Sequence, residues 1–394
     1  MREIVDKNQC YGCGACEQVC PVGCISMQPD SRGFLYPIID EEKCINCGKC
    51  QKHCIARQGE SDDSLEQVCY IGVHKNEDIW MNSASGGAFS AIVEALNCEN
   101  LIVFGAAYTE KNEVWHIHIN GIEELAKLRK SKYVQSRLGE AYKDVQEFLQ
   151  EGKRVVFSGT PCQIAGLYSV LGKDYENLYT LDLICTGVTS PLLLSKNMSM
   201  LEKKYKGSIR GVDMRYKVQT KDGWNIGDTE IVFEDGRRLR NKDTRLYRHV
   251  YGQKLAYRDS CYHCRYAKSS RGADITIGDW WGNIGQLSDI KEHKGISLML
   301  FNSKKGKELI PVLKEKMYMS EMDFELAQKD NPTLNSPTKK EVRYERFWHD
   351  FDRIRDERLF KKYAKPEMKT YIPWLLSRVI PAAARKRIKR LIHR

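Results

Sequence analysis

The sequence contains no long hydrophobic run. No stretch of the 394 residues approaches the roughly 18 consecutive apolar residues that a membrane-spanning helix needs. Residues 1–7 lack the apolar core of a secretory signal peptide. We therefore expect a cytoplasmic protein, in a reducing compartment where structural disulfides are rare. The fifteen cysteines are then expected to be metal ligands or buried thiols.

Acidic residues are almost absent from residues 365–394, where nine lysines and arginines accompany a single acid, Glu367. This segment carries most of the net charge of +11, and the remainder is nearly balanced. A basic amphipathic helix here would suit peripheral contact with an anionic membrane, and a solvated terminus explains the composition equally well. Charge confined to a terminus argues against a nucleic-acid interface. The apolar face of the predicted helix consists of Ala384, Ile388, Leu391 and Ile392.

Eight of the cysteines form two runs with the spacing C-x2-C-x2-C-x3-C. In bacterial ferredoxins with this spacing, three cysteines of a run bind one 4Fe–4S cluster and the fourth binds the other. A disulfide framework suits small secreted domains, and zinc sites usually show separated C-x2-C pairs. We predict two 4Fe–4S clusters in a ferredoxin-like α+β module over residues 1–57, with Cys24 as a buried apolar thiol. The predicted ligands are Cys10, Cys13, Cys16, Cys20, Cys44, Cys47, Cys50 and Cys54.

After a polar linker, the chain alternates between strand-like and helix-like segments. Helical spacing occurs at residues 89–96, 138–149 and 163–171. This alternation predicts an α/β core, and two Asp-Gly pairs near residues 222 and 235 predict hairpins in an added β-rich C-terminal part. We divide the core into residues 66–180 and 181–330, followed by a helical, basic tail over 331–394. The predicted strands span residues 68–73, 101–108, 155–159, 178–184, 275–279 and 296–301.

Four later cysteines lie at positions that would suit metal ligands. Cys162 and Cys185 each follow a predicted strand, and Cys261 and Cys264 form a C-x2-C pair. The four thiolates could converge on a third 4Fe–4S cluster. A zinc site at the pair and buried thiols elsewhere are the alternatives.

Ser85, Gly86 and Gly87 precede a helical pattern. Free backbone N–H groups at a helix start suit the phosphates of a flavin or nucleotide, although an ordinary helix cap has the same composition. Residues 130–136 are polar with one aromatic side chain, and they could grip an anionic cofactor or form a solvated helix face.

Four motifs occur together in this chain: Ser85-Gly86-Gly87-Ala88, residues 132–136, residues 158–163, and the C-x2-C pair followed by residues 273–282. The set resembles the family of β subunits of coenzyme F420 hydrogenases and dehydrogenases. The resemblance implies a flavin-binding core with FAD, and a family-type cluster near the flavin at Cys162, Cys185, Cys261 and Cys264. It also implies cofactor contacts from Ser85, Gly86, Gly87, Lys132, Tyr133, Gln135, Thr160 and Pro161.

We therefore expect an iron–sulfur flavoprotein oxidoreductase that relays electrons from 4Fe–4S clusters to FAD and on to an organic substrate. Similarity to bacterial members with a ferredoxin head suggests a role in surface polysaccharide biosynthesis. The alternative is a non-catalytic electron-transfer subunit that serves a separate dehydrogenase or hydrogenase. The expected partner is a soluble electron-carrier protein, a reduced deazaflavin or a nicotinamide. The residues single out no catalytic acid or base, although His116, His118 and His263 are available.

Overall fold

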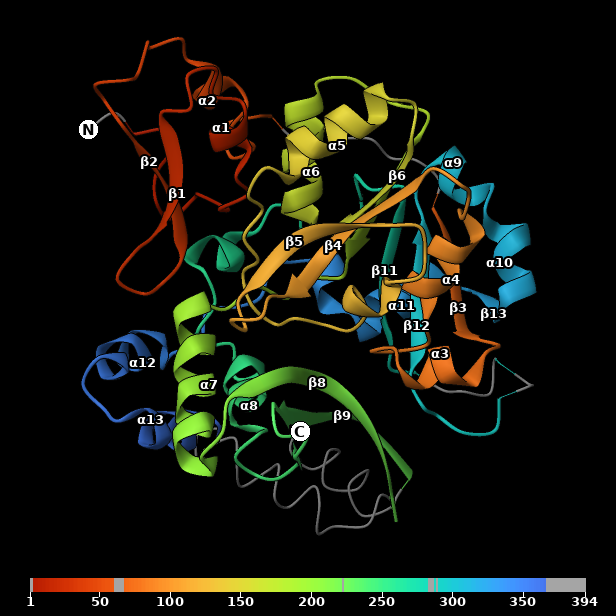
Figure 1. Ribbon diagram of the computed structural model, residues 1–394. Helices are drawn as coiled ribbons and strands as arrows, with labels where there is room; N and C mark the ends of the chain where they lie inside the picture. The colour runs from red at the N-terminus through yellow and green to blue at the C-terminus, as the bar shows by residue number, and fades with distance from the viewer. Residues whose placement is uncertain (1–2, 60–66, 222, 283–286, 288–289, 366–394) are drawn as a thin grey trace, which may run out of the picture.

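The computed structural model describes residues 3–59, 67–221, 223–282, 287 and 290–365. Its N-terminal module contains two short helices and one antiparallel hairpin (Figure 1). Each helix begins after a glycine in the left-handed conformation, Gly14 with φ 71° and Gly48 with φ 74°. Glycine adopts this conformation without strain, so the chain turns directly from a cysteine loop into a helix. The elements are α1 (Ala15–Gln18), β1 (Ile25–Pro29), β2 (Leu35–Ile39) and α2 (Lys49–Lys52).

An eight-stranded mixed sheet forms the centre of the molecule, in the order β13-β3-β12-β11-β7-β6-β4-β5. The strands β11, β7, β6 and β4 run parallel, and the outer strands pair antiparallel. The strand bounds are β3 (Val68–His74), β4 (Leu101–Tyr108), β5 (Val114–Asn120), β6 (Arg154–Gly159), β7 (Leu178–Leu183), β11 (Ile275–Trp280), β12 (Ile296–Phe301) and β13 (Met317–Met322).

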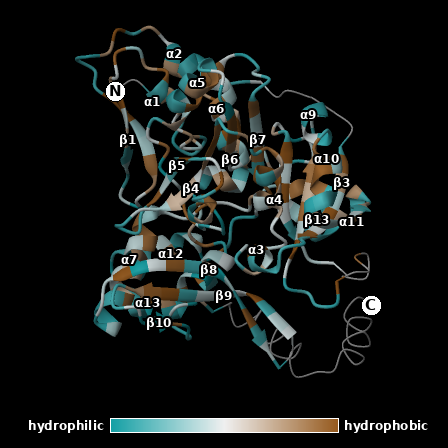
Figure 2. Ribbon diagram, turned by 45° about the vertical axis from the view of Figure 1, so that its right-hand side comes forward, coloured by the Kyte–Doolittle hydropathy of each residue, from teal (hydrophilic) through white to brown (hydrophobic). Residues whose placement is uncertain are grey.

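Helices cover both faces of this sheet. One apolar core places α4 (Ala88–Ala95) and α10 (Ile310–Lys316) against Val103 and Val156. On the opposite face, α5 (Ala141–Gln150) and α6 (Pro161–Leu171) pack on Phe104 and Phe157, and Ala15 of the module joins this core. Figure 2 shows hydrophobic residues along the central strands and a hydrophilic outer surface on α5. The smaller elements are α3 (Glu77–Met81), η1 (Leu125–Lys127), α9 (Lys304–Lys307), α11 (Phe324–Asp330) and η4 (Pro332–Leu334).

A helical group packs with a three-stranded antiparallel sheet beneath the module (Figure 1). Its core also includes Phe34 and Tyr36 from the module hairpin, so the module contacts both the central sheet and this lower group. The elements are α7 (Pro191–Tyr205), β8 (Ile209–Thr220), β9 (Gly223–Phe233), β10 (Arg238–Leu239), α8 (Leu246–Gly252), η2 (Asp259–His263), α12 (Tyr344–Phe351) and α13 (Asp356–Tyr363).

The expectation of a small cysteine-rich module followed by an α/β core is confirmed, and the predicted strands coincide with β3, β4, β6, β7, β11 and β12. The β-rich C-terminal part differs from the expectation, because only β8, β9 and β10 form a separate sheet. The other late strands join the central sheet, where β12 is buried on both sides. The sheet thus takes strands from both predicted core parts, so the proposed division at residue 180 stays a prediction.

None of the helices in the described ranges is long and apolar enough to span a bilayer. The predicted amphipathic helix of the tail lies outside the described residues, so it stays a prediction.

Gly86 lies against the backbone of two strands. A Cβ added there would overlap the carbonyl oxygen of Gly72 and lie 2.5 Å from the amide nitrogen of Ser297. We expect Gly86→Ala to lower the free energy of unfolding by roughly 1–3 kcal/mol through overpacking. The control is Gly252→Ala at the end of α8, where an added Cβ meets no atom within 4 Å. Denaturant unfolding measures both variants, and equal stability of the two would contradict the close contact at Gly86.

Candidate functional site

The eight cysteines of the module separate into two groups of four. Cys10, Cys13, Cys16 and Cys54 line one cavity. The second cavity is lined by Cys20, Cys44, Cys47 and Cys50. In each cavity three thiols come from one run and the fourth comes from the other, as the ferredoxin spacing requires.

The number of thiols in each group matches the ligand set of a 4Fe–4S cube. Within the described part of the chain, no three His, Cys, Asp or Glu side chains converge closely enough to hold one metal ion. A 4Fe–4S cube takes one thiolate at each of its four irons, and its ligands are therefore spread more widely than those of zinc. Each group of four thiols thus matches the ligand demand of one 4Fe–4S cluster.

Cys24 is buried beside the second cavity. Its backbone N–H donates to Cys20 Sγ at 3.4 Å, and its own sulfur lies 3.4 Å from the same atom. Hydrogen bonds to ligand sulfurs help to set the reduction potential of a cluster. The sequence spacing indicated only a buried thiol here.

The four scattered cysteines also come together. Cys162 lies in the first turn of α6, directly after β6, and Cys185 follows β7. Because β6 and β7 are parallel neighbours, their carboxyl ends meet at one edge of the sheet. Cys261 in η2 and Cys264 at its end complete the set, and all four thiols line one cavity of about 50 Å³.

The electrostatics of this cavity favour a positively charged occupant. Burial raises the pKa of the Cys162 thiol well above its usual range, and the nearby Cys264 adds to the effect. The same two causes raise the pKa of Cys185 to about 12. The thiols therefore lie close enough to repel one another as thiolates. Iron would supply the positive charge that keeps them deprotonated.

A buried ion pair holds this cavity in shape. Arg271 Nη2 donates to Asp182 Oδ2 and to the carbonyl oxygen of Leu183, both at 2.9 Å, and both charged side chains are 2% exposed. Arg271 Nη1 also donates to the carbonyl oxygen of Tyr266 at 3.0 Å. The pair therefore ties the end of β7, next to Cys185, to the loop that follows Cys264.

A larger cavity of about 270 Å³ lies beside the carboxyl ends of β6, β7 and β11, near the start of α4. Gly87 precedes α4 with φ 93°, and the first helical residues Ala88, Phe89 and Ser90 line this cavity. The Ala88 N–H donates to Ser297 Oγ at 3.3 Å, whereas helix geometry leaves the N–H groups of the next two residues without partners inside the helix. Arg129 supplies positive charge to the lining, and Lys130 also lines the cavity but forms an ion pair with Asp213. This combination fits the pyrophosphate of a dinucleotide such as FAD. Of the predicted cofactor contacts, the lining includes Ser85, Gly87, Lys132, Tyr133 and Thr160.

Lys132 stabilises the loop that carries these cations. Its Nζ donates to the carbonyl oxygens of Leu128 at 3.1 Å and Arg129 at 2.6 Å. Burial lowers the pKa of Lys132 to about 7. Its positive charge is therefore weak near neutral pH, and the hydrogen bonds to the loop are its main structural contribution.

Three predicted cofactor contacts lie outside the lining of the larger cavity. Gly86 instead allows close packing on β3 and β12. Gln135 and Pro161 line the four-cysteine cavity. Gln135 Oε1 accepts from the Leu35 backbone N–H at 3.0 Å, so this side chain joins the core to the module.

The two core cavities share a polar wall formed by Ser136, Thr160 and Gln163. Thr160 Oγ1 lies 3.2 Å from Cys162 Sγ, and the Thr160 backbone N–H donates to Gln163 Oε1 at 2.9 Å. Gln163 Nε2 donates to Ser136 Oγ at 2.9 Å. A chain of polar contacts therefore leads from a predicted cluster ligand to the larger cavity.

His116 ends this chain in the larger cavity. Its Nδ1 lies 3.0 Å from Ser136 Oγ, and Nε2 lies 3.1 Å from the carbonyl oxygen of Ser158. Because a carbonyl only accepts, Nε2 carries the proton and Nδ1 accepts from Ser136. Burial lowers the pKa of His116 to about 4, so the ring is neutral near pH 7. From the sequence alone, His116 was an available histidine without a role.

We expect Asp182→Ala to destabilise the protein by about 3–5 kcal/mol, because it leaves the Arg271 charge buried without its partner. The matched control is Asp235→Ala, which breaks an exposed pair with Arg237 and is expected to change stability by about 0–1 kcal/mol. Chemical denaturation of both variants tests the difference. Similar losses at the two positions would show that the buried pair does not hold the cavity.

Comparison with known proteins gives matches in two parts of the chain. Residues 9–57 match the model of the 4Fe–4S dicluster domain. Residues 152–326 match the model that describes the C terminus of the coenzyme F420 hydrogenase/dehydrogenase beta subunit. The second match includes all four scattered cysteines.

The chain is also similar to two individual proteins. The chain is 23% identical over 310 residues to the F subunit of F(420)H(2) dehydrogenase from Methanosarcina mazei, an alignment that covers 74% of this chain and 82% of the relative. It is also similar to a chain of the F420-reducing [NiFe] hydrogenase complex from Methanosarcina barkeri. That alignment has 18% identity and a TM-score of 0.44, and it covers 70% of this chain and 93% of the other.

The two matched regions support the presence of two 4Fe–4S clusters and a role in electron transfer. Together they show that the chain combines a 4Fe–4S dicluster domain with a region similar to the C terminus of the coenzyme F420 hydrogenase/dehydrogenase beta subunit.

Proposed function

We propose that this chain is an iron–sulfur flavoprotein oxidoreductase whose module receives electrons and whose core delivers them to FAD and then to an organic substrate. The observation that carries the proposal is a row of four cavities with shared walls. Ile4 lines both module cavities, and Tyr11 and Gly12 line both a module cavity and the four-cysteine cavity. The polar wall at Thr160 then separates that cavity from the larger one.

The outer end of this row is suited to receive electrons from a soluble carrier. Cys47 is exposed, although it lines the outer module cavity. Val22 and Ile45, which line the same cavity, are also exposed, at 41% and 61%. Apolar side chains around an accessible cluster provide a small contact surface, which is typical of transient redox complexes.

FAD in the larger cavity would connect two kinds of chemistry. Clusters exchange single electrons, whereas organic substrates usually require two. In this proposal Arg129 binds the pyrophosphate, and the start of α4 supplies backbone donors. The neutral His116 and its partner Ser136 fix the polar wall of the cavity. The identity of the substrate, including a surface polysaccharide precursor, stays a prediction.

The name of one relative favours a second candidate function. Because the relative from Methanosarcina mazei is named as one subunit of a dehydrogenase, this chain could transfer electrons to a separate catalytic partner. The two functions differ in whether the purified chain, loaded with its cofactors, oxidises or reduces a small organic molecule without that partner.

Cofactor content tests the proposed relay directly. After anaerobic purification we expect about twelve irons and one FAD per chain, since each cube contains four irons. Cys162→Ser is expected to retain about eight irons, because it removes a ligand of the third cluster only. Cys98→Ser, at a partly buried cysteine outside the cavities, is the control and should retain twelve. Eight irons in the wild type would contradict the proposed third cluster. Absence of flavin would favour the alternative function, in which the chain only transfers electrons.

Flavin affinity tests the larger cavity. Arg129→Met removes a cation from its lining, and the loss of a charge-assisted hydrogen bond of about 1.5 kcal/mol corresponds to roughly tenfold weaker FAD binding. Lys127→Met, at an exposed position two residues earlier, should bind FAD as the wild type does. Titration of deflavinated protein followed by flavin fluorescence measures both affinities. Equal affinity of the two variants would place the pyrophosphate elsewhere.

A further inference from the structure

Arg258 is a buried cation at the boundary between the module and the core. The residue is 1% exposed, and its Nε donates to the carbonyl oxygen of Cys10 at 2.7 Å. Nη1 donates to the carbonyl oxygen of Leu35 at 2.9 Å, and the guanidinium carbon lies 3.9 Å from the centre of the Tyr36 ring. Nη2 has no hydrogen-bond partner in the described part of the chain. All of the recorded partners are neutral.

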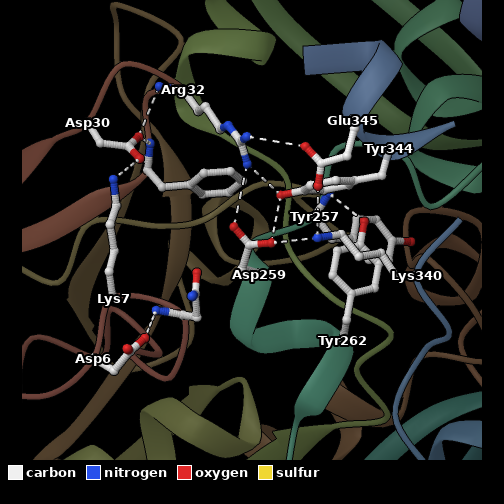
Figure 3. A network of polar contacts seen from close by, with 12 residues as sticks. Asp6, Lys7, Asp30, Arg32, Tyr257, Asp259, Tyr262, Lys340, Tyr344 and Glu345 are labelled. Atoms are coloured by element: carbon white, nitrogen blue, oxygen red, sulfur yellow. Dashed lines mark hydrogen bonds and ion pairs between the residues drawn. The ribbon is translucent and has the colours of Figure 1, made fainter. Parts of the chain in front are cut away.

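The adjacent carboxylate does not neutralise Arg258, because it is engaged by other groups. Figure 3 shows Asp259 directed toward Arg32, Tyr344 and Lys340. Its Oδ1 accepts from Tyr344 at 3.0 Å and from Lys340 Nζ at 3.1 Å, and Oδ2 lies 3.5 Å from Arg32 Nη1. Two cations therefore already share the charge of Asp259.

A buried charge without an opposite charge is strongly unfavourable, so a position of this kind needs an anion. The groups around Arg258 that can become anionic are cysteines predicted to bind clusters. Its guanidinium is so close to the loop between Cys10 and Cys13 that a Cβ on Gly12 would lie 3.0 Å from its Cζ. Its carbonyl oxygen accepts from the Cys261 backbone N–H at 2.9 Å.

We propose that Arg258 is the shared countercharge of two 4Fe–4S clusters, one at Cys10, Cys13, Cys16 and Cys54 and one at Cys162, Cys185, Cys261 and Cys264. The part that concerns the module cluster depends on the dicluster domain. The part that concerns the cluster at Cys162, Cys185, Cys261 and Cys264 rests on the proposed function. A cube with its four thiolates is negatively charged, and reduction adds one further negative charge. A fixed cation in a site without water therefore stabilises the reduced form.

Arg258 in this inference is a positioning residue that acts on the potential of the clusters. The aromatic ring of Tyr36 and the backbone of the cysteine loop exclude water from the guanidinium, so its charge is weakly screened. One side chain then raises the midpoint potentials of two neighbouring clusters together. The difference between the two potentials is maintained, and each cluster accepts an electron more readily.

The test is a redox titration of the anaerobically reconstituted full chain, monitored by electron paramagnetic resonance. In Arg258→Met we expect the reduced-to-oxidised ratio of both clusters to fall at least tenfold at the wild-type midpoint, a shift of about 59 mV for one electron. Arg258→Lys retains the charge and is expected to stay within threefold of the wild type. Arg245→Met is the control, because Arg245 pairs with Asp228 away from all four cavities.

Unchanged potentials in Arg258→Met with full iron content would overturn the inference. If that variant does not retain its clusters, Arg258→Gln replaces it. If the cluster midpoint potentials of Arg258→Lys are then as low as those of Arg258→Gln, the positive charge does not cause the raised potentials. The same comparison in the Cys162→Ser background isolates the first cluster. If the midpoint potential shifts in that background and the wild type contains eight irons, the role of Arg258 at the first cluster is supported. The third cluster and the proposed relay are then contradicted.

Discussion

The parallel pairing of β6 with β7 determines the geometry of both core cavities. The pairing places residues that follow the two strands at one edge of the sheet, so Cys162 and Cys185 meet although they lie far apart in sequence. Thr160 begins α6 at this edge, where it also contributes to the polar wall. The thiols, the start of the helix and the larger cavity therefore depend on the same strand register. A change of register would separate all of them at once.

Directional hydrogen bonds fix the module on this edge of the core. Gln18 Oε1 accepts from the Tyr142 backbone N–H at 2.8 Å, and Gln135 Oε1 accepts from the Leu35 backbone N–H at 3.0 Å. Both glutamine side chains are buried, so a rotated module would leave unsatisfied polar groups in a dry interface. Apolar contacts at Ala15 and Phe34 add area, whereas the two amides select one orientation. The module cysteines consequently face the core cysteines in a single arrangement.

Local patterns in the sequence predicted the local structure well. Apolar runs located six of the eight strands of the central sheet, and β5 and β13 were not predicted. The cysteine spacing predicted how the eight thiols divide between the two cavities of the module, and their role as cluster ligands stays a prediction. Long-range placement was harder. Gly86 and Gln135 belong to motifs associated with the cofactor, yet one serves backbone packing and the other joins two parts of the molecule. Arg258 gave no signal, since an arginine in a sequence is most often a surface residue.

The common wall at Ser136, Thr160 and Gln163 restricts how this protein can change over evolution. A substitution in the wall alters the four-cysteine cavity and the larger cavity together, and it also disturbs the start of α6. Substitution of residues that line only the larger cavity, such as Phe89, Ser131 and Ile277, alters that cavity alone. Selection can therefore reshape the far side of that cavity for new molecules while the route for electrons stays intact. A lineage built on this chain would diversify in what it acts on more easily than in how it is supplied with electrons.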